Sequence, residues 1–153
     1  MNLAENDFLS VEPLMVARLN AALSGLSPAV HVLTAADLAD VAEARQPVPA
    51  VHVIYDGFRV VEARGDGLVY RLEHTWLAVT ATRNVANTRT GAAARRDASA
   101  LMAKAGAALA GFVPTGFSNP LRVTTPPRPG FRTGYQYLPL AFLHQTFFHA
   151  SPP

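Results

Sequence analysis

The segment from Leu68 to Thr82 constrains the fold more than any other part of the chain, because its side chains divide into the two faces of one long strand. One face carries Tyr70, Leu72, His74, Trp76, Ala78, Thr80 and Thr82. The other face is polar over residues 71–75 and apolar over residues 77–81. This change predicts a strand that passes from a solvent-facing region into a covered one, with a bulge or bend near His74.

Turn signals before this strand predict an antiparallel meander. The run Ala50–Tyr55 is rich in β-branched residues and ends in Asp56-Gly57, a strong hairpin signal. We expect a return strand over Phe58–Arg64, after which the turn Gly65-Asp66-Gly67 leads into the long strand.

Three more strands are expected on either side of the meander. A short strand is predicted over Val30–Leu33, and a brief one over Leu121–Thr125, before a proline-rich stretch that cannot be regular. The last strand is expected over Gly134–His149. Pro139 lies within it and lacks an N–H group, so this strand is predicted to be an edge strand, bulged, or split in two.

Two of the three predicted helices lie in the first third of the chain. Ser10 is expected to cap a helix over Val11–Leu26, whose apolar positions recur every three or four residues and which ends around Gly25 to Pro28. Thr34 is expected to cap a second, short helix that carries Leu38, Val41 and Ala42 on one side.

The third helix is expected to begin near Asp97, as a cap or first-turn acid, and to run to about Gly111. The first half of the preceding segment, Arg83–Arg96, is predicted to be a mobile loop. The many alanines of the helix predict close packing on a sheet, through a buried stripe of Leu101, Met102, Ala105, Ala108, Leu109 and Phe112.

These elements predict a single-domain α/β (α+β) fold over residues 1–150. A mixed, mostly antiparallel sheet is expected to be flanked by two main helices, and residues 151–153 are expected to be a disordered tail. Half of the 153 residues are apolar, which is enough for one core without metal or disulfide staples.

No catalytic or metal-ligating pattern stands out. Cysteine is absent, and His31, His52 and His74 fall in separate predicted strands without a zinc-ligand spacing. The acidic residues occur where predicted turns and helix starts favour them, so they need no catalytic explanation. The sequence contains no nucleophile elbow and no phosphate-binding loop. We therefore expect no enzymatic activity, no catalytic or metal residues and no cofactor, although a small hydrolase stays a third hypothesis.

The charges of the chain are segregated along the sequence. Residues 1–82 hold five arginines and ten carboxylates, a net charge of −5, whereas residues 83–153 hold eight basic residues and only Asp97, a net charge of +7. The cluster Arg83, Arg89, Arg95 and Arg96 fits two interpretations equally well. It is either a surface that meets phosphate or a carboxylate-lined protein, or a solvated loop.

Two kinds of partner follow from this charge pattern. If like subunits meet head to tail, the negative part of one can face the positive part of the next, and such contacts close into rings when the rotation permits. The alternative is a nucleic-acid-binding accessory domain that uses the Arg83–Arg96 loop. The single lysine and the negative first half argue against nucleic acid.

Membrane and secretion signals are missing from the sequence. The N-terminus is acidic, and no apolar run approaches the roughly 20 residues that span a bilayer. We expect a soluble protein that is not secreted by a cleaved signal and has no membrane partner.

The order of elements resembles the small tail-terminator proteins of long-tailed bacteriophages, including the Mu-like Gp37 family and relatives of the phage lambda tail-completion protein. The resemblance covers most of the chain and is one of layout. It is carried by the opening helix Val11–Leu26, the strand His74–Arg83, the Arg83–Arg96 loop, the helix from Leu101 to Pro114, and the closing segment Tyr135–Phe148.

This resemblance implies a structural protein without an active site. It implies a hexameric ring on the last ring of a phage tail tube, which stops tube growth and presents a face to the head-side connector. Its partners are then its own copies, the tail tube protein and the head–tail connector, and its place is the virion tail of a phage or prophage, assembled in the bacterial host cytoplasm. By position, the expected interface residues are Arg83, Asn87, Arg89, Arg95 and Arg96.

Overall fold

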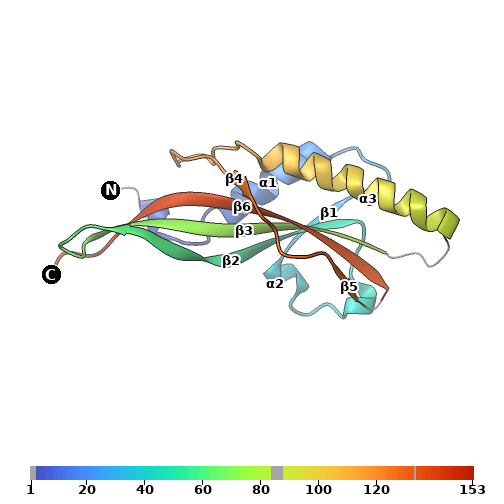
Figure 1. The fold of residues 1–153 in the computed structure, drawn as a ribbon, viewed down its shortest axis with the longest axis horizontal. Helices are drawn as coiled ribbons and strands as arrows, with labels where there is room; N and C mark the ends of the chain where they lie inside the picture. The colour runs from blue at the N-terminus through green and yellow to red at the C-terminus, as the bar shows by residue number, and fades with distance from the viewer. Residues whose placement is uncertain (1–2, 84–87, 133) are drawn as a thin grey trace.

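The protein is built on one sheet with its two main helices on one face, as a computed structural model describes it for residues 3–83, 88–132 and 134–153. The long strands β2 (Ala50–Ala63), β3 (Val69–Arg83) and β6 (Tyr135–His149) are antiparallel neighbours and run the length of the molecule (Figure 1). The helices α1 (Glu12–Leu23) and α3 (Thr88–Leu109) cover one face of these strands. The predicted α+β single-domain class is confirmed.

Shorter elements complete the two edges of the sheet. Its order is β1-β2-β3-β6-β4, and β5 also pairs with β6, beside β4. β1 runs parallel to β2 at one edge, while β4 and β5 pair with β6 at the other. The short elements are η1 (Leu3–Asn6), β1 (His31–Thr34), α2 (Ala35–Leu38), η2 (Glu43–Arg45), β4 (Arg122–Thr124) and β5 (Gly130–Arg132).

The core lies between the helices and the face of β3 that carries Trp76. Met15 and Leu19 of α1 and Leu109 of α3 are fully buried against Trp76 and, from β6, Phe142. On the opposite face of β3, Val79 and Ala81 are buried and Arg71 and Thr75 are partly exposed, but Glu73 is also buried. The predicted passage of this strand into a covered region is therefore confirmed only in part.

The hairpin predicted at Asp56-Gly57 is wrong, because β2 continues through both residues. The register shifts between Tyr55, which pairs with Trp76, and Phe58, which pairs with His74. Two residues of β2 thus face Thr75 alone, which is a β-bulge. β3 is long enough to pair with both halves of β2, and Gly57, at φ +90°, absorbs the extra residue. The bulge or bend expected near His74 of the long strand is wrong for β3, which pairs with β6 without a register shift; the bulge lies on β2 instead.

Replacing Gly57 by alanine should destabilise the protein by about 1–2 kcal/mol, because a side chain at positive φ is strained. The matched control is Gly65→Ala, at a glycine without positive φ and with nothing within 4 Å of an added Cβ. We expect that control to change the free energy of unfolding by no more than about 1 kcal/mol, in the stabilising direction. Urea unfolding followed by circular dichroism measures both. Equal stability of the two variants would contradict a bulge at Gly57.

One predicted helix cap is wrong and one is confirmed. The Ser10 hydroxyl donates hydrogen bonds to the carbonyl oxygens of Ala4 and Asp7, and α1 begins without a side-chain cap. Thr34 does cap α2: its hydroxyl accepts from the Asp37 N–H, and the Asp37 carboxylate accepts from the Thr34 N–H.

Helix α3 begins at Thr88, well before the predicted start near Asp97. Alanine and arginine favour helix strongly enough to extend it across Gly91, and Asp97 therefore lies inside the helix. The part of the predicted mobile loop at residues 84–87 lies outside the described residues. The predicted stripe is confirmed for Leu101, Ala105, Ala108 and Leu109, with Met102 and Phe112 partly buried.

Close packing of α3 on the sheet is also confirmed. A Cβ added at Gly106 would lie 3.0 Å from Leu140 Cδ1 of β6. β6 itself is not split at Pro139, which pairs opposite Val79 of β3. β5 pairs with residues up to Tyr137 and β4 with residues from Ala141, so Pro139 lies at a local edge where its missing N–H breaks no strand pairing on that side.

Candidate assembly surfaces

The structure places three of the five predicted interface residues on its described surface. Arg83 ends β3, and its guanidinium lies 5.5 Å above the centre of the Tyr135 ring. Arg95 and Arg96 are exposed, but on helix α3 and not in a loop as predicted. Arg89 also lies on α3, although its side chain is outside the described part, and Asn87 lies outside the described residues.

Arg95 lines a groove that the sequence did not predict. This basic groove, of about 500 Å³, is lined by Arg95 of α3, by Arg128 and Pro129 before β5, and by Phe131, Gln136 and Leu138. Phe131 is 57% exposed. No carboxylate belongs to the described lining, so the groove combines two cations with an apolar surface.

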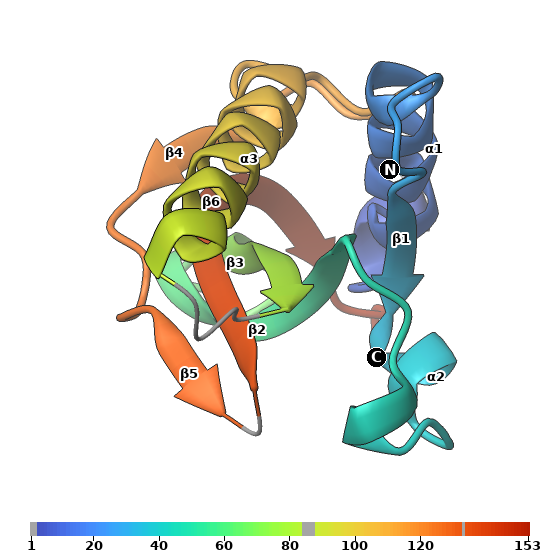
Figure 2. The same cartoon turned by 90° about the vertical axis from the view of Figure 1, so that its right-hand side faces the viewer.

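Acidic residues gather at the opposite edge of the sheet. Glu12 at the start of α1, Asp37 in α2 and Asp40 just after α2 form what we call the acidic flank. Burial, and then the negative charge of Asp37, raise the pKa of Glu12 above its usual value. In the end-on view of Figure 2, α2 lies at the lower right of the central strands and β5 at the lower left, while α3 lies above the strands.

The two charged parts of the sequence are not fully separated in space. Arg132 pairs with Glu43 across the molecule at 2.9 Å, and Arg122 lies 3.5 Å from Glu73. Glu73 also accepts hydrogen bonds from Arg59 and Gln145. Burial would raise the pKa of Glu73, but these hydrogen bonds and the charges of both arginines hold it below its usual value. Part of the positive second half is therefore neutralised within the subunit.

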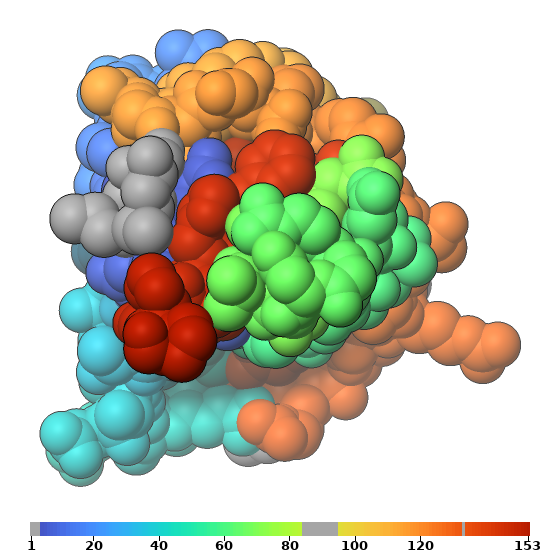
Figure 3. Space-filling model, turned by 90° about the vertical axis from the view of Figure 1, so that its left-hand side faces the viewer, coloured from blue at the N-terminus to red at the C-terminus, as the bar shows by residue number. Residues whose placement is uncertain are grey.

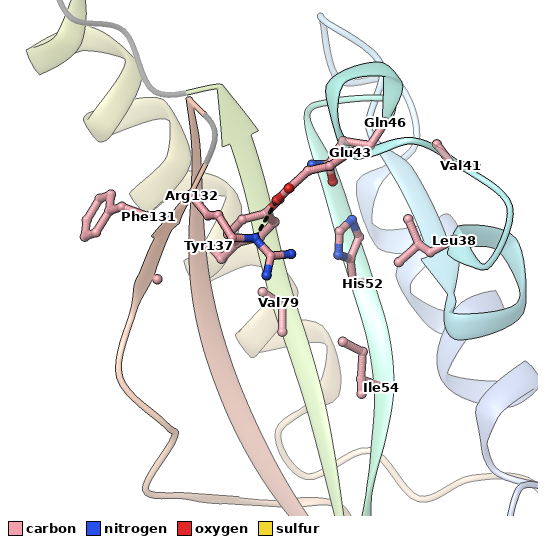
Figure 4. A pocket seen from close by; sticks show the side chains of 11 residues that line it. Leu38, Val41, Glu43, Gln46, His52, Ile54, Val79, Phe131, Arg132 and Tyr137 are labelled. Carbon is pink, nitrogen blue, oxygen red and sulfur yellow. Dashed lines mark hydrogen bonds and ion pairs between the residues drawn. The ribbon is translucent and has the colours of Figure 1, made fainter.

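A second hollow lies on the sheet face away from the main helices (Figure 4). This cleft, of about 550 Å³, separates the segment of α2 and η2 from β5. Tyr137 and Arg132 each donate a hydrogen bond of 2.9 Å to Glu43, and Gln46 donates one of 2.7 Å to Tyr137. These contacts occupy the Glu43 carboxylate. The sequence offered no signal for this cleft, because its residues come from separate segments.

Two histidines meet in the core. His74 and His144 are directly opposite in the pairing of β3 with β6. His74 shares hydrogen bonds of 2.8 Å with Tyr55 and with Thr146, and His144 bonds the carbonyl oxygen of Asn119 at 3.1 Å. Within the described residues, no group of three or more histidines and acids is placed to hold a metal ion.

A comparison with protein families decides what kind of protein this is. The family model described as phage tail terminator protein matches residues 4–152, nearly the whole chain. The chain belongs to the phage tail terminator family. It is therefore a structural component of a phage tail that interacts with other tail components, and its family is not known for enzymatic activity. A search of curated proteins found no match.

The family assignment does not test membership in the Mu-like Gp37 subfamily or nucleic-acid binding by the Arg83–Arg96 segment, and both stay predictions. In the part of the chain that is described, no helix has the length and apolar character needed to cross a membrane.

Proposed function

We propose that this tail terminator forms a hexameric ring of like subunits that caps the tail tube, stops its growth and joins it to the head-side connector. The proposed partners are its own copies, the tail tube protein and the head–tail connector. Assembly in the cytoplasm of the bacterial host, from a phage or a prophage, belongs to the same proposal. Arg83, Asn87, Arg89, Arg95 and Arg96 stay its candidate interface residues.

The observation that supports a ring is the position of two unlike charged surfaces at opposite edges of one sheet. Figure 3 looks onto the end of the molecule that carries the β2–β3 hairpin. The cyan segment around α2 projects on one side and the orange segment between β4 and β5 on the other. A subunit with two different complementary surfaces repeats head to tail, and such repetition closes into a ring when the rotation permits.

The proposed capping role is tested by the length of the tail tubes. In a phage or prophage that encodes this chain, its deletion should give tubes of irregular and greater length, without attached heads, in electron micrographs. Supplying the chain from a plasmid should restore uniform tails with heads. Tails of normal length that carry heads in the deletion strain would contradict the proposal.

A further inference from the structure

The basic groove and Asp40 both carry charge that the subunit itself does not neutralise. Five arginines, at positions 59, 64, 71, 122 and 132, form ion pairs with carboxylates of the same chain. Among the described residues, neither Arg95 nor Arg128 forms such a pair. Asp40 is likewise exposed and without an ion pair in the described part, so these charges are free to meet an outside partner.

Apolar side chains lie next to the unpaired charges both in the groove and beside Asp40. Arg95 and Arg128 border the apolar side chains of Phe131 and Leu138 in the groove. Asp40 is followed directly by Val41, which is 38% exposed. A carboxylate beside an exposed apolar side chain fits a groove that offers guanidinium groups beside apolar surface, because guanidinium binds carboxylate with paired hydrogen bonds.

We propose that the basic groove of one subunit receives the Asp40–Val41 segment of a second copy of this chain, and that this contact joins neighbours in the assembly. The inference rests on the proposed ring and adds which two surfaces meet in it. The described lining of the groove contains neither Asp40 nor Val41. Within one subunit, the cleft that Val41 and Phe131 both line lies between this segment and β5.

Charge reversal in the groove tests this contact. The double variant Arg95→Glu/Arg128→Glu should weaken self-association at low salt by about tenfold or more, as measured by sedimentation, because it sets like charges against Asp40. Lys104→Glu is the control: it lies about two and a half turns along α3 from Arg95, on the opposite side of the helix, and lines a separate groove with Leu26 and Val30. It should leave self-association unchanged. Equal weakening by both changes, or by neither, would overturn the proposal.

A sharper version of this experiment restores opposite charges on the two surfaces by reversing both of them. Adding Asp40→Arg to Arg95→Glu/Arg128→Glu should recover most of the lost self-association, whereas Asp40→Arg alone should weaken it. If the groove instead serves nucleic acid, the double reversal abolishes binding of duplex DNA at low salt and leaves self-association intact. That outcome contradicts the proposal and favours the alternative partner.

The absence of cysteine allows a direct map of the contact. Under mild oxidation, the variant Asp40→Cys/Arg128→Cys should give a ladder of disulfide-linked oligomers, because each subunit then joins a neighbour on both sides. Each single variant should give no ladder. Rings in electron micrographs without any ladder would overturn this contact alone, whereas a wild-type chain that never self-associates would contradict the ring as well.

Discussion

Replacing Trp76 by alanine should lower the free energy of unfolding by about 3–5 kcal/mol, the largest effect we expect from one substitution. Trp76 is 1% exposed, and its ring centre lies 4.8 Å from that of Tyr55. It lies on the helix-covered face of β3, within the same cluster as Met15 and Leu19 of α1. The loss therefore combines less apolar burial with a cavity that both helices would have to close.

Urea unfolding followed by far-UV circular dichroism measures this loss, since the variant has no other tryptophan to report by fluorescence. The control is Val113→Ala, at a side chain that is 48% exposed in the loop after α3. It should cost less than about 0.5 kcal/mol. A loss of under about 1 kcal/mol for Trp76→Ala would show that the helices do not pack on this face of the sheet.

Acid should destabilise the protein through its buried histidines. Burial, and then the charge of His144, lower the pKa of His74 from 6.5 to about 4. Burial also lowers the pKa of His52 and of His144. Between the two pKa values of His74 the unfolded chain binds more protons than the folded one. The stability due to neutral His74 is thus complete above about pH 6.5 and is lost as the pH falls toward 4.

The expected size of this loss for His74 alone is on the order of 2 kcal/mol between about pH 7.5 and about pH 5. Free energies of unfolding measured at both pH values test it. His74→Gln should be less stable at the higher pH, because the contacts with Tyr55 and Thr146 change, but should show a smaller loss on acidification. The control His31→Gln, at an exposed position of β1, should keep the slope of the wild type. An identical slope in His74→Gln would contradict a buried, neutral imidazole.

Local sequence signals predicted those elements whose structure is decided locally. The alternation of β3, the Thr34 cap and the apolar stripe of α3 all follow from spacing within one segment, and all three are present. The Asp56-Gly57 signal failed because pairing with β3 on both sides of Gly57 outweighs the local preference for a turn. The early start of α3 was missed because a run of arginines was interpreted by its charge and not by its helix propensity.

The candidate surfaces depend on distances that sequence order does not give. Arg95 was recognised from its cluster, but its neighbour in the groove, Arg128, lies in a separate proline-rich segment. The pairing of Arg132 with Glu43 likewise joins residues far apart in the chain, so charge counts alone overstate the free positive charge. The charge split along the sequence stays a prediction of two unlike surfaces, for which the structure offers Arg95 and Arg128 as basic candidates and Asp37 and Asp40 as acidic ones.

The proposed ring is tested most directly by the assembly state of the chain together with its tail tube protein at low salt. Mass measurement and electron microscopy of the mixture should show closed rings of this chain at one end of each tube, and the rings should dissociate as salt screens the contact between charged surfaces. A strictly monomeric chain at high concentration, with bare tube ends and no rings in the micrographs, would contradict the proposed ring.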